Sequence, residues 1–235
     1  MPPPVLTGLR ADAVVAGYDP RRPVINHVDL TVPAGRTTGL AGPSGSGKST
    51  LARVLALLHK PFAGSVHLDD EPVTGFRHRT PHAQRVRVGV LFQQPRLSVD
   101  PRMTLRAAIG EPLLATRAPD VAERVDELAD LVMLTSDLLT RRAHEVSDGQ
   151  LQRACLARTL ALDPGYLICD EMTTMLDAST TAALVGLIRD YQARTGAGVL
   201  AISHDTVLLD HWADHTVRLT SGGVLDASSA PTTTT

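Results

Sequence analysis

The chain has 235 residues, enough for one large domain or two small ones, and its 43% hydrophobic and 20% charged residues are ordinary for a globular protein. The formal net charge of −2 lacks the positive surplus typical of proteins that bind nucleic acids, so no nucleic acid is expected as a partner. No apolar run approaches the roughly 18–20 residues that span a bilayer. The two cysteines, Cys155 and Cys169, lie in apolar runs and provide neither a zinc-ligand spacing nor a disulfide framework.

The first part of the chain predicts short strands around one glycine-rich loop. Alternation of Val28, Leu30 and Val32 favours a half-buried strand, and strand segments are predicted at 11–19, 26–32, 37–42, 64–73 and 85–95. After the loop, apolar residues at helical spacing predict a helix over 49–60, which Pro61 would end. We interpret His78 and His82 as surface residues of a loop.

From residue 98 to about 145 the pattern becomes helical, with one clear amphipathic segment at 121–134. Strands are expected again at 166–171 and 198–205, with a helix at 183–195 between them. Such strand–helix alternation predicts an α/β fold with a mostly parallel core sheet. We therefore expect a single domain over 1–225, a helical subdomain at about 96–160 within it, and a disordered polar tail at 226–235.

The loop after the third predicted strand has the spacing of a phosphate-binding loop, G-x-x-x-x-G-K-[ST]. Glycines let backbone N–H groups close around phosphate oxygens, and the following helix directs its positive end at them. Lys48 would supply charge to the β- and γ-phosphates, and Ser49 a hydroxyl ligand for Mg²⁺. The predicted nucleotide-binding residues of this loop are Gly42, Pro43, Ser44, Gly45, Ser46, Gly47, Lys48, Ser49 and Thr50.

Two carboxylates follow the apolar run at 166–169, at the end of the strand where open α/β sheets bind ligands. Asp170 is predicted to hold Mg²⁺ and Glu171 to polarise the attacking water. A solvated strand end would be the structural alternative, and the phosphate loop elsewhere in the chain weighs against it.

The order of motifs GPSGSGKST, FQQP, VSDGQ, YLICDE, MLD and ISHD resembles the ATPase subunit of an ABC transporter, over about residues 18–223. The stretch VSDGQ is similar to the family's LSGGQ signature. On its own it could be a helix N-cap with Ser147 or Asp148 as the cap. The resemblance implies a P-loop NTPase (ABC ATPase) fold with an N-terminal antiparallel β part and an all-helical insert. It also implies that two ATPase chains sandwich two ATP molecules head to tail.

The remaining site residues are assigned by this resemblance. Tyr18 would stack on adenine, although it could be an ordinary strand tyrosine. Gln93 would contact Mg²⁺ and the attacking water, with the adjacent Gln94 as the alternative. His204 would contact the γ-phosphate, so that Glu171, His204 and Gln93 are the predicted catalytic residues and Ser49, Gln93 and Asp170 the metal ligands. Across the dimer, the nucleotide would meet Ser147, Gly149, Gln150 and Asp177.

The sequence departs from the family pattern at three places. Asp148 replaces a signature glycine and puts a carboxylate near a triphosphate, where repulsion could cost a few kcal/mol if the side chain faced it. We expect the side chain to point away. Met172 replaces a proline after the Asp-Glu pair, and Thr174 and Met175 replace Ser-Ala. A heterodimer whose other chain bears compensating changes is one coherent explanation, and a homodimer remains open.

The stretch FQQPRLSVDPRMTL is similar to ATPases of peptide and nickel importers. The resemblance implies an ATP- and Mg²⁺-dependent subunit at the cytoplasmic face of the cell membrane, which powers solute import through separate transmembrane permease subunits. Two alternatives are kept: a hydrolytically weak ABC partner subunit of a heterodimer, and an ABC ATPase that acts outside transport.

Overall fold

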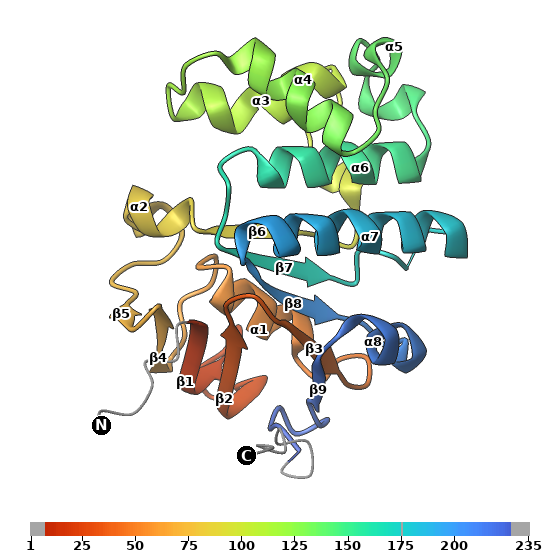
Figure 1. Cartoon of the computed structure of the whole chain (residues 1–235). Helices are drawn as coiled ribbons and strands as arrows, with labels where there is room; N and C mark the ends of the chain where they lie inside the picture. Colours follow the sequence, from red (N-terminus) through yellow and green to blue (C-terminus); the bar gives the residue numbers. More distant parts are fainter. Residues whose placement is uncertain (1–7, 175, 227–235) are drawn as a thin grey trace.

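The computed structural model describes residues 8–174 and 176–226, which fold into two sheets and a group of helices (Figure 1). The predicted tail lies outside the described residues except for Asp226. Within the described part of the chain, no helix is both long and apolar enough to cross a membrane.

The core is a five-stranded sheet in which every pair of neighbours is parallel. β7 and β8 are buried along all five of their residues, as expected for central parallel strands covered on both faces. Because the strands are parallel, the loops that follow β3, β6, β7 and β8 emerge at one edge of the sheet. In the order β6-β7-β8-β3-β9, the strands are Val88–Leu91, Tyr166–Asp170, Gly198–Ile202, Thr37–Ala41 and His215–Arg218.

A second sheet is antiparallel and lies beside the core sheet, at the N-terminal part of the chain (Figure 1). The alternation that predicted the second strand is visible in its burial, because Val28, Leu30 and Val32 are buried between exposed or half-buried neighbours. In the order β2-β1-β4-β5, the strands are Ile25–Pro33, Gly8–Ala16, Ala63–Leu68 and Glu71–Pro72.

Apart from the short α2 (His82–Arg85), the helices form two groups. α1 (Lys48–Leu55), α7 (Ala178–Thr195) and α8 (Thr206–Trp212) accompany the sheets, and α3 to α6 gather at the opposite end of the molecule from the antiparallel sheet (Figure 1). The second group consists of α3 (Leu105–Ala115), α4 (Val121–Leu131), α5 (Ser136–Leu139) and α6 (Asp148–Leu160), with the 3₁₀ turns η2 (Pro95–Leu97) and η3 (Ala143–Glu145). The expected α/β fold, with a parallel core sheet, an antiparallel β part and a helical insert, is confirmed.

Several sequence predictions differ from the structure. α1 ends at Leu55 rather than at residue 60, because Leu57 takes a left-handed φ of 61° and the His59 ring bonds to the carbonyl of Gly17 at 2.8 Å. The strand predicted at 85–95 forms only over β6 (Val88–Leu91), and all of β6 except Leu91 is half-buried rather than buried. His78 and His82 are exposed as predicted, yet they lie in η1 (Arg77–Arg79) and α2 (His82–Arg85) rather than in a loop.

Candidate functional site

The glycine-rich loop connects β3 to α1, and its backbone has conformations that favour glycine. Gly47, at the N-cap of α1, has a φ of 104°, in the left-handed range that side chains rarely adopt. A Cβ added at Gly42 would lie 2.4 Å from the carbonyl oxygen of Leu219. The loop therefore lies against the residue that follows β9, and it delivers the first turn of α1, with its free N–H groups, to the edge of the core sheet.

Lys48 is the first residue of α1 and is only 5% exposed. Its ammonium donates hydrogen bonds to the carbonyl oxygens of Gly42 (2.9 Å) and Pro43 (3.0 Å), across the loop. The Oγ of Ser46 is buried with no hydrogen-bond partner. A buried cation and an orphaned hydroxyl in one loop suit a ligand with several strong acceptor oxygens.

Asp170 ends β7 and meets the loop through Ser49, whose hydroxyl donates to Asp170 Oδ1 at 3.2 Å. Asp170 is 7% exposed, and this burial raises the pKa of its carboxyl above the ordinary value, although the Ser49 hydrogen bond opposes the shift. A buried carboxylate beside a hydroxyl is an oxygen donor set that Mg²⁺ prefers. The residues present therefore fit a magnesium ion.

Glu171 is the residue on which the other predicted catalytic side chains converge. Its carboxylate lies 3.8 Å from Lys48 Nζ and 3.7 Å from His204 Nδ1, and Gln93 Nε2 donates to it at 3.4 Å. Glu171 has a φ of 48°, a left-handed backbone that costs on the order of 1–3 kcal/mol in a non-glycine residue. Side chains that follow β3, β6, β7 and β8 thus meet at one carboxylate.

Two observations bear on the alternatives for Gln93 and Tyr18. The hydrogen bond to Glu171 comes from Gln93, while Gln94 is the N-cap of the turn η2. Tyr18 is 68% exposed, so it is not a core strand tyrosine; its hydroxyl accepts from Arg53 at 2.6 Å. A cavity of about 770 Å³ is lined by Tyr18, Ser49, Gln93 and Asp170 among others.

The stretch VSDGQ begins α6 in the helical group. Ser147 is the N-cap: its hydroxyl accepts from the Gln150 N–H at 3.2 Å, and Gln150 Oε1 accepts from the Ser147 N–H at 3.0 Å. Ser147, rather than Asp148, is therefore the cap. The Asp148 carboxylate pairs with Arg96 at 2.7 Å.

Gly149 faces the loop that carries Asp177. A Cβ at Gly149 would lie 2.8 Å from Thr180 Cγ2, and Thr180 in turn donates to Asp177 through its N–H (2.9 Å) and its hydroxyl (2.8 Å). Asp177 is the N-cap of α7, and hydrogen bonds from Ser179 and Thr180 lower the pKa of its carboxyl. The signature stretch and the Asp177 loop meet at Thr180.

The sequence profile of the ABC transporter family matches residues 25–174, which include the phosphate loop, VSDGQ and the Asp170-Glu171 pair. The chain belongs to the ABC transporter family. A peptide import ATP-binding protein of Brucella ovis is 36% identical to it over 211 residues, which cover 88% of this chain and 66% of that protein. The nickel import ATP-binding protein NikE of Escherichia coli is 34% identical over 213 residues, 89% of this chain and 80% of that protein. This ABC chain thus spans just under two-thirds of the length of the Brucella relative.

Solved structures of ABC cassettes have the same fold. The cbiO1 protein of Clostridium perfringens, part of the ABC transporter complex cbiONQ, superposes with a TM-score of 0.82 over 93% of this chain and 86% of its own, at 22% identity. A dimeric bacterial ABC transporter cassette superposes with a TM-score of 0.81 over 93% of this chain and 96% of its own, at 23% identity.

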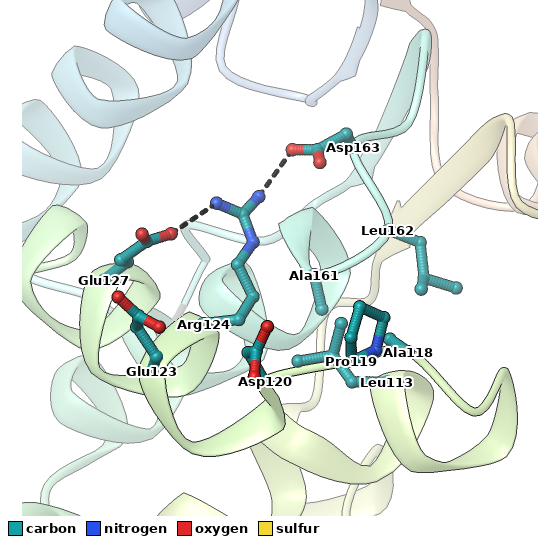
Figure 2. A pocket seen from close by; sticks show the side chains of 10 residues that line it. All are labelled: Leu113, Ala118, Pro119, Asp120, Glu123, Arg124, Glu127, Ala161, Leu162 and Asp163. Atoms are coloured by element: carbon teal, nitrogen blue, oxygen red, sulfur yellow. Dashed lines mark hydrogen bonds and ion pairs between the residues drawn. The ribbon is translucent and has the colours of Figure 1, made fainter.

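This ABC chain also has a cavity of about 510 Å³ in its helical group, away from the predicted site (Figure 2). Four carboxylates line it, and Arg124 reaches between Glu127 (2.9 Å) and Asp163 (2.6 Å). A surplus of negative charge disfavours a triphosphate there. Among the described residues, no group of three His, Cys, Asp or Glu side chains is placed to hold a metal ion.

Sequence reasoning did not single out Arg53, Arg96 or Gln152. Arg53 could have been found, since it lies four residues after Ser49 on α1 and hence on the same face. Gln152 is 1% exposed and donates to the carbonyl of Phe92 at 3.4 Å, a contact between segments 60 residues apart that no local pattern reveals. Of the three departures in this ABC chain, Met172 is buried in the core, and Met175 lies outside the described residues.

Proposed function

We propose that this chain binds ATP with Mg²⁺ and hydrolyses it as the ATPase subunit of an importer. The observation that carries the proposal is the convergence of Lys48, Gln93 and His204 on Glu171, beside the Ser49–Asp170 hydrogen bond. Each of these side chains comes from the carboxyl edge of one parallel sheet, where ligands of such sheets bind.

The phosphate loop would bind the β- and γ-phosphates. On binding, the ammonium of Lys48 exchanges the carbonyl oxygens of Gly42 and Pro43 for phosphate oxygens, a stronger, charge-assisted interaction. Ser49, Asp170 and Gln93 would hold Mg²⁺, which neutralises charge that develops on the phosphates. The exposed ring of Tyr18 is available to stack on the adenine base.

Glu171 is proposed as the general base that takes a proton from the attacking water. Gln93 would orient that water, since its amide already bonds to the same carboxylate, and His204 would contact the γ-phosphate. A positioned general base typically contributes about 10²–10⁴ in rate. The left-handed φ of Glu171 is a strained backbone of the kind that clusters at active sites, which supports this role.

A second ATPase chain would complete the site. In the head-to-tail arrangement, Ser147, Gly149 and Gln150 at the N-terminus of α6, with Asp177, would meet the triphosphate held by the partner's phosphate loop. The free N–H groups of a helix start support this role, because they attract anions. Closure over ATP would exclude water and so gate hydrolysis by dimerisation.

Transmembrane permease subunits on separate chains are the proposed membrane partners, which would place this chain at the cytoplasmic face of the cell membrane. The proposed transport class is import of a peptide, of nickel or of a metal chelate; the names of the relatives support the first two. Asp148 and Met172 favour a second candidate, a hydrolytically weak subunit of a heterodimer. A weak subunit would bind ATP normally but would show no turnover even with its permeases.

The Glu171→Gln variant tests the proposal. Gln retains a hydrogen-bonding partner for Gln93, and Lys48 keeps its two carbonyl acceptors, so folding and ATP binding should persist. Steady-state hydrolysis should fall about 10²–10⁴-fold, while light scattering should detect an ATP-dependent dimer. A Lys48→Ala variant is the control that should neither bind nor dimerise. Failure of the wild-type chain to bind ATP with Mg²⁺ would contradict the proposal.

A further inference from the structure

The first turn of α6 carries a carboxylate at the position where the proposed partner triphosphate arrives. Asp148 is the first residue of the helix, directly after the Ser147 cap. A helix N-terminus attracts anions, but a free carboxylate at that end offsets the positive potential of the helix dipole and repels a second anion. An unpaired Asp148 would therefore oppose the binding that the loop is proposed to perform.

The structure places a cation against this carboxylate. Arg96 belongs to the turn η2, and its Nη2 lies 2.7 Å from Asp148 Oδ1. The same guanidinium donates to the carbonyl oxygens of Ala143 (2.8 Å) and Val146 (3.2 Å), just before the helix. The guanidinium thus makes three contacts at the start of α6 and just before it. Its planar shape lets it hold several acceptors at once, which the single ammonium of a lysine does less well.

The environment of the carboxylate makes this pair matter. Asp148 Oδ1 is covered by protein and has no aligned hydrogen bond, so the nearby guanidinium is its charge partner while the side chain as a whole is 42% exposed. Such half-exposed pairs add little to folding stability. The Arg96–Asp148 pair has a larger effect on a nearby multiply charged anion, because the guanidinium cancels most of the repulsion that the carboxylate would exert on that anion.

We propose that Arg96 is a positioning residue that neutralises Asp148 and so lets the VSDGQ loop accept the triphosphate bound by a second copy of this chain. The inference rests on the proposed function, in which two copies close over ATP. The side chain of Asp148 thus points toward Arg96. The Arg96–Asp148 ion pair joins the segment that follows Gln93 to the VSDGQ stretch.

Four proteins test this, all with Glu171→Gln to prevent turnover: the parent, Arg96→Gln, Asp148→Asn, and the double variant. Gln at position 96 is neutral but can still donate to backbone carbonyls, and Asn at position 148 nearly preserves shape. The readout is the ATP concentration that gives half dimerisation. Arg96→Gln should raise it about tenfold, equal to about 1.4 kcal/mol, when Asp148 is present, and less than about twofold when Asn replaces it.

Equal shifts in both backgrounds would overturn the inference, because they would assign Arg96 a purely structural role. The charge-based defect should also shrink as salt rises from about 0.05 M to about 0.5 M, since screening shortens the reach of the bare carboxylate. Binding of a fluorescent ATP analogue to monomers should be the same in all four proteins. A parent that binds ATP yet stays monomeric overturns the inference, whereas a parent that binds no ATP refutes the proposed function itself.

Discussion

The Gly149→Ala substitution probes the contact between the signature stretch and the Asp177 loop. Alanine has the better helix propensity by about 0.5–1 kcal/mol, so α6 alone would favour it. The added Cβ, however, would lie 2.8 Å from Thr180 Cγ2, closer than carbon atoms approach one another. Thr180 cannot rotate away freely, because its hydroxyl bonds to Asp177 at 2.8 Å.

Overpacking of this kind costs about 1–3 kcal/mol. After the propensity gain is subtracted, Gly149→Ala should lower the free energy of unfolding by up to about 2 kcal/mol, or leave it nearly unchanged if the helices separate slightly. Thr180→Ser removes the clashing methyl and keeps the hydroxyl that bonds to Asp177. The double variant should therefore be more stable than the sum of the two single variants predicts.

Urea denaturation of the four proteins measures this coupling. The double-mutant cycle should give a favourable interaction of about 1 kcal/mol or more. A Gly149→Ala protein that is more stable than wild type by the full propensity gain, with no coupling to Thr180→Ser, would refute the contact. ATP turnover should decline in Gly149→Ala and recover in the double variant, because displacement of Thr180 moves Asp177.

Two further predictions concern the ligand-binding groups. Burial raises the pKa of Asp170, so in the ligand-free protein the ionised carboxylate lowers the folding stability. This stability is regained as the pH falls through the raised pKa, and it is fully regained below the ordinary pKa of 3.8. Asp170→Asn should therefore raise the melting temperature at pH 7 and leave it unchanged below pH 3.8. An unchanged melting temperature across that range would show that Asp170 is not desolvated in solution. Tyr18→Leu should weaken ATP binding by about 1–3 kcal/mol, whereas Tyr18→Phe, which loses only the bond from Arg53, should bind within about twofold of wild type. Equal losses in the two variants would mean that the hydroxyl, not the ring, holds the nucleotide.

Local sequence was sufficient for the parts of the protein that neighbouring residues build. The phosphate loop and the helix start at VSDGQ depend on residues adjacent in the chain, although the structure was needed to show that Ser147 rather than Asp148 is the cap. The apolar run before Asp170 is long enough to identify a buried strand. For the same reason strand–helix alternation predicted the parallel sheet. The end of α1 was not predictable in this way, because a contact from His59 to the distant Gly17 turns the chain before Pro61 does.

The sequence by itself thus determined the fold class and the residue types available for binding a nucleotide. Only the tertiary structure decided which of them meet: Glu171 with Lys48, Gln93 and His204, and Asp148 with Arg96. The physical reason is that helical and strand periodicities report which face a residue occupies, whereas the pairing of faces depends on how the sheet orders its strands. Arg96 and Asp148 lie in segments about fifty residues apart, and contact between η2 and α6 brings them together.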